Sequence, residues 1–160
     1  MPKIRPYLAQ DRAAAALVFY RAVREGAAAH YPAVELAAWA PSPEPDHGHP
    51  DKLIDQWCYV AEDGGRMTGF FSMDATGYLD MAFVIPEVMG NGTAAALYDA
   101  LMEHAKAAGL TRFTVRAAHQ SRRFLSRRGW QFDRMETFDE DGHVYSVAHL
   151  YLDLKASHDP

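Results

Sequence analysis

The sequence predicts a mixed α/β fold in one domain, with mostly antiparallel strands. Three strand-like runs in the middle of the chain are joined by short glycine-containing links, which are too short for parallel crossovers. A long amphipathic helix then lies between two further strand-like runs, as in a parallel crossover. The length of 160 residues is typical of one domain with a substantial core. We therefore treat 1–160 as a single domain.

The first third of the chain predicts a strand, two helices and a loop. Asp11 is a suitable N-cap for the first helix, and Pro41 ends the second, because the residue before a proline disfavours the helical region. Residues 41–51 hold four prolines, which indicates a mobile or substrate-facing loop. The expected elements are a strand at Lys3–Leu8 and helices at Asp11–Ala28 and Val34–Ala40.

The rest of the chain predicts six strands and two helices, followed by a tail at 155–160. The best helix carries an apolar stripe at i, i+3, i+4 spacing and stops at Gly109. The expected strands are Trp57–Glu62, Met67–Ala75, Tyr78–Ile85, Arg112–Ala117, Trp130–Phe138 and Val144–Leu154, and the helices are Thr93–Ala108 and Ser121–Arg128.

Composition excludes several classes of protein. The 16 Lys and Arg against 21 Asp and Glu give a net charge of −5, which argues against a general nucleic-acid binder. The one cysteine, Cys58, allows neither an internal disulfide nor a cysteine-based metal site. No run approaches the roughly 18 apolar residues of a membrane span, and the N-terminus lacks the apolar core of a signal peptide. We expect a cytoplasmic protein that binds no membrane.

The most informative stretch joins a strand to the best helix through two glycines, Gly90 and Gly92. Free N–H groups point outward at such a junction, and the helix dipole adds about half a positive charge. Glycines allow phosphate oxygens to approach the backbone closely. The loop therefore predicts an anion site built from main-chain groups.

Two common phosphate-binding loops fit poorly. A Walker loop needs Lys and Ser/Thr after its glycines, whereas Thr93 and Ala94 follow Gly92. A dinucleotide site would accept Gly90-Asn91-Gly92, but its glycines normally follow the first strand of the domain and an acid ends the next strand. Here three strand-like runs come first, and Arg112–Ala117 carries no acid. Dinucleotide binding stays open as a minor alternative.

The same stretch resembles the GNAT superfamily of N-acetyltransferases. In that family a strand ends in Val-x-Pro, and Gln/Arg-x-x-Gly-x-Gly/Ala opens the long helix. Val84, Pro86, Gly92 and Ala94 match this pattern, and Gly90 stands where glycine is common. The run 124–130, Phe-Leu-Ser-Arg-Arg-Gly-Trp, resembles the family's Phe-Tyr-x-x-x-Gly-Phe. The order of elements also fits over nearly the whole chain, and the runs 19–23 and 38–41 look like those of a bacterial subgroup with unassigned substrates.

The resemblance implies a seven-stranded, mixed but mostly antiparallel sheet flanked by about four helices. It also implies acetyl-CoA as cosubstrate, transfer of the acetyl group to a primary amine of a small molecule or peptide, and no metal. Main-chain groups of Ala82, Phe83 and Val84 would pair with the pantetheine arm. The pyrophosphate would lie on the loop formed by Met89, Gly90, Asn91, Gly92, Thr93 and Ala94.

The chain departs from the family at three positions. Met89 replaces the usual Gln or Arg, which contributes chiefly its backbone. Leu125 stands where many members carry a tyrosine that protonates the leaving thiolate, and Ala118 replaces an asparagine near the cofactor. A CoA thiol is a fairly good leaving group and one acid contributes about 10²–10⁴-fold, so activity remains compatible with these losses.

Several side chains are candidates for the chemistry. Asp80 is either the base that neutralises the amine or a solvent-facing strand residue. Tyr145 is either an acid or substrate contact, or a packing residue with a wet hydroxyl. His119 is a titratable loop histidine or simply solvated. Tyr31 and Trp39, in the first two helices, line an amine pocket or pack in the core.

Two further groups are weaker candidates. His47 and His49 lack further ligands at metal-binding spacing, so we expect no metal site. The arginines at 122, 123, 127 and 128 either reach the 3′-phosphate of CoA or form a solvated helix face. Exposed strand edges make a homodimer plausible. The sequence thus favours an acetyl-CoA-dependent N-acetyltransferase, with a non-catalytic acyl-CoA-binding module as the alternative.

Overall fold

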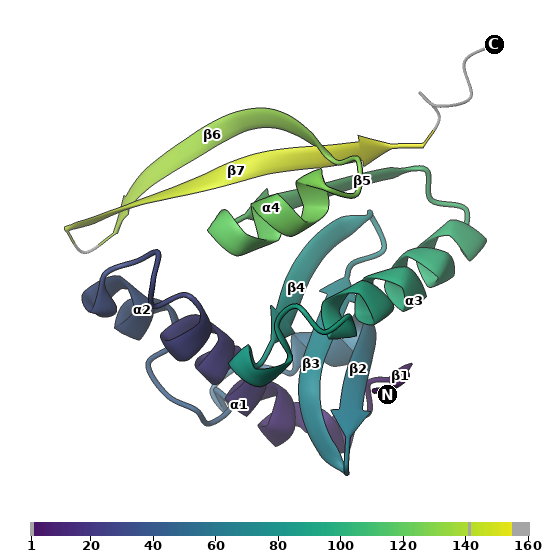
Figure 1. Ribbon diagram of the computed structural model, residues 1–160, viewed down its shortest axis with the longest axis horizontal. Helices are drawn as coiled ribbons and strands as arrows, with labels where there is room; N and C mark the ends of the chain where they lie inside the picture. The colour runs from purple at the N-terminus through teal and green to yellow at the C-terminus, as the bar shows by residue number, and fades with distance from the viewer. Residues whose placement is uncertain (1, 141, 155–160) are drawn as a thin grey trace.

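A computed structural model describes residues 2–140 and 142–154, and Figure 1 shows one sheet with helices packed against it. The described strands form a seven-stranded sheet in the order β1-β2-β3-β4-β5-β7-β6, and the β4–β5 pair is parallel while the others are antiparallel. The predicted fold class is therefore confirmed. The strands are β1 (Lys3–Pro6), β2 (Trp57–Asp63), β3 (Arg66–Met73), β4 (Tyr78–Val84), β5 (Arg112–Ala117), β6 (Gln131–Glu140) and β7 (His143–Asp153), and the helices are α1 (Arg12–Arg21), α2 (Ala33–Trp39), α3 (Thr93–Ala107) and α4 (His119–Ser126).

The helices cover opposite faces of the β2–β4 part of the sheet because successive strand residues alternate between faces. Phe70 on β3 is buried in one core with Val18 of α1, whereas its neighbour Phe71 is buried in another with Leu97 and Leu101 of α3. The stripe predicted for α3 is largely correct, since its positions 97, 101 and 105 are buried and only the last, Ala108, is exposed.

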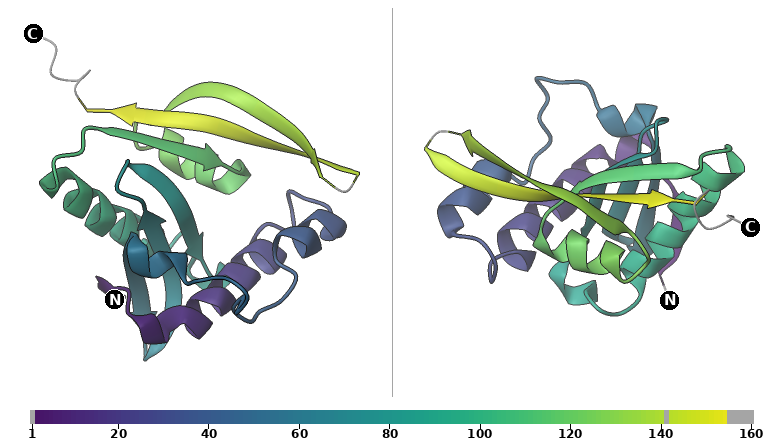
Figure 2. Two further views of the ribbon diagram at one scale, coloured as in Figure 1. Left: turned by 180° about the vertical axis from the view of Figure 1, so that it is seen from behind. Right: turned by 90° about the horizontal axis from the view of Figure 1, so that it is seen from above.

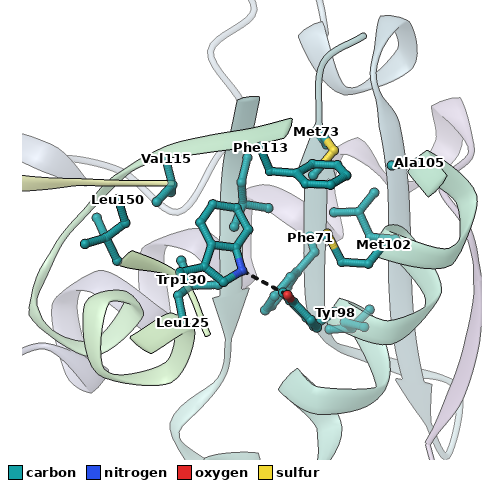
Figure 3. Close-up of a cluster of buried hydrophobic side chains, with 14 of the residues drawn as sticks. Phe71, Met73, Tyr98, Met102, Ala105, Phe113, Val115, Leu125, Trp130 and Leu150 are labelled. Carbon is teal, nitrogen blue, oxygen red and sulfur yellow. Dashed lines mark hydrogen bonds between the residues drawn. The ribbon is translucent and has the colours of Figure 1, made fainter. Parts of the chain in front are cut away.

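A hydrogen bond between two large aromatic side chains joins α3 to the segment between α4 and β6. The buried Trp130 donates from Nε1 to the hydroxyl of Tyr98 at 2.9 Å, and Figure 3 shows the two side chains pointing toward each other. Phe113 of β5 packs beside Trp130, with ring centroids 6.3 Å apart. This contact anchors α4, and with it the β5–β7–β6 part of the sheet, to the rest of the core.

β4 and β5 are paired only between the start of β4 and the middle of β5. Tyr78 and Leu79 lie opposite Thr114 and Val115, and the N–H of Thr114 donates to the carbonyl of Gly77 at 3.1 Å. Further along, β4 stays paired with β3 on one side but has no described partner on the other. The sheet therefore opens between β4 and β5, and Figures 1 and 2 show β5, β7 and β6 diverging from β1–β4.

The first helix begins directly after Asp11, as predicted, but the Asp11 side chain does not cap it and the α-helix ends earlier than predicted. Asp11 is the last residue of a 3₁₀ turn, and its carboxylate does not cap α1. The carboxylate instead accepts two hydrogen bonds from the Arg5 guanidinium at 2.8 Å and one from the N–H of Leu8 at 2.7 Å. Charge-assisted hydrogen bonds from arginine are stronger than those from neutral backbone N–H groups. The Asp11 carboxylate therefore pairs with Arg5 and does not cap the helix. α1 ends at Arg21 and continues as a wider π turn through Gly26.

Other expected boundaries also shift. The first strand ends at Pro6 instead of Leu8, and the last helix begins at His119, so this histidine lies in α4 and not in a loop. Residues 41–51 form neither helix nor strand, as expected for the proline-rich segment. The predicted tail 155–160 and the first residue of the turn Asp141–Gly142 lie outside the described residues.

We expect Gly77→Ala to lower the free energy of unfolding by about 3 kcal/mol. Its φ of +91° disfavours a side chain, and an added Cβ would lie 2.5 Å from the Arg112 carbonyl oxygen. Gly64, with φ of +62° and nothing within 4 Å, is the control, and Gly64→Ala should cost about 1 kcal/mol. Urea unfolding measures both, and equal losses would contradict a close approach of β4 and β5 at Gly77.

Candidate active site

A cavity of about 610 Å³ lies where β4 and β5 diverge. Its walls come from β4, β5, α1, α2 and α4, together with the loop that precedes α3 and the β6–β7 hairpin. Most of its lining is apolar. The lining includes Phe19, Val23, Tyr31, Trp39, Phe71, Ala82, Phe83, Val84, Met89, Gly90, Ala94, Arg116, Ala118, Ser121, Phe124, Leu125, Phe138 and Val147.

At one end of the cavity is the glycine loop predicted from the sequence. Gly90 and Gly92 adopt φ values of +81° and +93°, and an added Cβ at either position would meet nothing within 4 Å. The Asn91 side-chain oxygen accepts from the N–H of Thr93 at 3.0 Å and from its hydroxyl at 2.7 Å. Asn91 therefore fixes the turn that leads into α3.

Several main-chain donors of this loop are unused by the protein. Within the described part of the chain, the N–H groups of Gly90, Gly92, Ala94 and Ala95 have no hydrogen-bond acceptor. They lie at the N-terminus of the 15-residue helix α3, where the helix dipole is positive. This arrangement suits a negatively charged group.

The wall that leads away from the loop is the free edge of β4. The N–H of Ile85 donates to the Thr68 carbonyl of β3 at 2.9 Å. Because the bonds of an antiparallel strand alternate between its two edges, Ala82 and Val84 turn their backbone groups toward the opening and Phe83 turns its own toward β3. The strand thus offers a row of main-chain groups to an extended ligand.

Asp80 occupies a β-bulge at the start of this free edge. Ser72 pairs with Met81 while Met73 pairs with Leu79, so Asp80 is the extra residue. Its carboxylate lies 2.9 Å from Lys52 Nζ and accepts from Gln56 Nε2 at 3.0 Å. Its side chain is only 18% exposed and is not part of the cavity lining.

The other end of the cavity is closed by a row of aromatic rings. Trp39 lies at ring-centroid distances of 4.9 Å from Tyr31 and 5.3 Å from Tyr145, which lies 5.5 Å from Phe138. The row connects the α2 region with strands β6 and β7, and Figure 2 shows these two strands extending toward α2. Tyr31 precedes α2 and is not helical, contrary to the prediction, but it lines the cavity together with Trp39. Tyr145 is buried behind the wall.

The cavity lining contains one charged side chain, Arg116, which the sequence alone did not single out. Its guanidinium lies 3.1 Å from Glu136 and 5.6 Å from the centre of the Phe138 ring. Glu136 also bonds with His149 at 2.8 Å, and these contacts hold the pKa of Glu136 below its usual range. Alternation along β5 puts Arg116 on the face opposite the buried Phe113 and Val115, but only the topology shows that this face lines a cavity.

Leu125, at the position where the family often has a tyrosine, is buried and lines the cavity. The hydroxyl groups in the lining belong to Tyr31 and to Ser121, which lies one helical turn before Leu125. The Tyr31 hydroxyl accepts from the N–H of His119 at 3.0 Å. The His119 ring is 4.1 Å from that of His30 and borders a smaller neighbouring pocket.

The remaining candidates are not among the residues that line the cavity. Cys58 is buried in the α1 core, and burial raises the pKa of its thiol to about 12. Two of the four arginines stack on aromatic rings: Arg128 on Phe124 at 3.8 Å and Arg122 on Phe132 at 4.7 Å.

Histidines and long apolar helices show neither a metal site nor a membrane span among the described residues. His49 pairs with Asp46 at 2.6 Å in an exposed loop, and residues 2–140 and 142–154 contain no group of three or more potential metal ligands. No helix in the same ranges is long and apolar enough to cross a membrane.

Comparison with known proteins identifies the family. The family model of the acetyltransferase (GNAT) domain matches residues 50–146, more than half of the chain. The protein belongs to the GNAT acetyltransferases. It is therefore an acyltransferase, and the match includes the divergent strands, the glycine loop and α3. A comparison with curated protein sequences finds no match.

Solved structures of the same fold cover nearly the whole chain. A GCN5-related N-acetyltransferase from Rhodopseudomonas palustris is 27% identical, with 96% of both chains covered and a TM-score of 0.87. A putative acetyltransferase from Salmonella typhimurium, solved with its cofactor acetyl-CoA, is 19% identical over 96% of this GNAT chain and 94% of its own, with a TM-score of 0.68. The PaiA N-acetyltransferase from Thermoplasma acidophilum, in complex with coenzyme A, is 15% identical over 96% and 99%, with a TM-score of 0.72. At these two lower identities the likeness establishes the fold alone.

Proposed function

We propose that this GNAT protein transfers the acetyl group of acetyl-CoA to a primary amine of a small molecule or peptide by direct attack. The observation that carries the proposal is the cavity between β4 and β5, which has unused main-chain donors at one end and an apolar compartment at the other. Such a cavity can hold the anionic cofactor and the acceptor side by side.

The pyrophosphate of acetyl-CoA binds the loop Met89–Ala94, where free N–H groups and the dipole of α3 favour negative charge. The pantetheine arm lies along β4 and hydrogen-bonds with the free edge at Ala82 and Val84. The named contents of the Salmonella and Thermoplasma structures, acetyl-CoA and coenzyme A, support this choice of cosubstrate. Asn91 contributes by holding the loop in shape.

The reaction begins when the neutral amine attacks the thioester carbonyl carbon. The new C–N bond forms as the carbonyl oxygen becomes an oxyanion, which an N–H of the β4 edge stabilises. The intermediate collapses by breaking the C–S bond, and the amine proton leaves to a base. The amine arrives as an alkyl ammonium of pKa about 10.4, which costs roughly 4–5 kcal/mol to neutralise at pH 7. A base therefore removes this first proton before the attack, and the proton lost on collapse is the second.

Asp80 is the proposed base, acting through water because its carboxylate does not line the cavity. The bulge directs it toward Lys52 and Gln56, next to the free edge of β4. Leu125 cannot protonate the leaving thiolate, so solvent or a hydroxyl of the lining, on Tyr31 or Ser121, supplies that proton. Tyr145 as the acid stays a prediction; its buried ring supports Trp39 from behind.

We expect Gly92→Ala to weaken acetyl-CoA binding about tenfold, which corresponds to about 1.4 kcal/mol, because a side chain would stand between the backbone and the pyrophosphate. Gly109, at the opposite end of α3, is the matched control: its φ is +94° against +93° at Gly92, and both positions are open. Gly109→Ala carries the same backbone strain and should leave the dissociation constant unchanged. Calorimetric titration measures both, and equal weakening would exclude pyrophosphate binding at Gly92.

We expect Asp80→Asn to lower kcat/KM about 10²-fold near neutral pH, because an amide cannot accept the proton. Asp55→Asn, at an exposed carboxylate in the 3₁₀ turn that contains Lys52, is the control and should behave as wild type. Release of the CoA thiol is measured over a pH series. An unchanged profile would remove Asp80 from the mechanism, and tight acetyl-CoA binding without turnover of any amine would favour a binding module.

A further inference from the structure

We propose that the acceptor is an amine carried on an aromatic or other bulky apolar body without a second positive charge. This inference rests on the proposed acetyl transfer and names the substrate class of the same site. Its basis is the aromatic and aliphatic part of the cavity, hereafter the acceptor end, which is lined by Phe19, Val23, Tyr31, Trp39, Phe138 and Val147.

The shape of the acceptor end favours a flat apolar group. Trp39 is held between Tyr31 and Tyr145, so its ring has neighbours on two sides and a fixed orientation. On the α1 wall, Phe19 packs edge-on against Phe83 of β4 at 4.9 Å. Rings fixed by such contacts offer preformed surface to another ring at little cost in side-chain entropy.

The charges around the acceptor end exclude a second ammonium group. None of the residues that line the cavity is Asp or Glu, and its one charged side chain is the cation Arg116. The nearby carboxylate of Glu136 is already bound by Arg116 and His149. A second cationic group would therefore lose its hydration and find no free carboxylate to pair with.

The same apolar surroundings favour the chemistry of the reacting amine. Desolvation lowers the pKa of an ammonium group, because a low-dielectric environment disfavours the charged form. An acceptor with an apolar body brings its amine into this environment by the burial of that body. The apolar body of the acceptor thus promotes both its binding and the deprotonation of its amine.

The test compares two primary alkyl amines, 2-phenylethylamine and 1,5-diaminopentane, by release of the CoA thiol from acetyl-CoA. We expect kcat/KM to be at least about tenfold higher for phenylethylamine. Trp39→Ala should lower kcat/KM for phenylethylamine about tenfold and leave diaminopentane within about twofold, whereas Trp39→Phe should retain most of the preference. Val34→Ala, at a 54% exposed position of α2 outside the lining, is the control and should change neither.

Failure of this inference is distinguishable from failure of the proposed function. Equal or better turnover of diaminopentane, or an equal loss for both amines in Trp39→Ala, overturns the acceptor class while acetyl transfer stands. If acetyl-CoA does not bind, the proposed acetyl transfer and the acceptor class that rests on it are both wrong. If acetyl-CoA binds but neither amine turns over, calorimetry of phenylethylamine with the CoA-bound protein decides: binding that Trp39→Ala abolishes supports the acceptor class, and no binding overturns it.

Discussion

The site depends on the short pairing between β4 and β5. Two residue pairs join the start of β4 to the middle of β5, and Gly77 lets the backbones approach closely there. Beyond this point β4 keeps its ladder with β3 and gives up its second neighbour. An unpaired strand edge is unfavourable unless the fold covers it or a ligand uses it. The packing of the two cores and the contact between Trp130 and Tyr98 offset the unfavourable free energy of this open edge. They hold the separated parts of the sheet in place.

Features with local causes were predictable from the sequence. Gly64-Gly65 and Gly77 mark the turns of the β2–β4 meander, and the apolar spacing of α3 survives in its buried positions 97, 101 and 105. Features that depend on distant partners were not. Asp11 satisfies every local rule for a helix cap, yet Arg5 of β1 takes its carboxylate. The bulge at Asp80 and the cavity-facing position of Arg116 likewise follow from strand register, which one strand alone does not specify.

The proposed chemistry relies more on placement than on ionisable groups. Leu125 stands in place of the usual tyrosine acid, and Asp80 lies outside the lining of the cavity. What remains at the divergence is a row of backbone groups and a compartment of fixed rings. Juxtaposition of two reactants is worth roughly 7–11 kcal/mol in favourable cases, more than the roughly 3–5 kcal/mol that one proton-transfer group supplies. The cavity therefore offers the larger of the two contributions.

Asn91 has a consequence for how quickly a ligand can be captured. Its side chain already holds the first residue of α3 by two hydrogen bonds, so the loop has its turn in place before anything occupies it. A flexible glycine loop would have to be immobilised on every encounter, at about 1–2 kcal/mol for each backbone residue fixed. In this protein that ordering is completed during folding. An anion that reaches the loop then meets a backbone turn that is already formed.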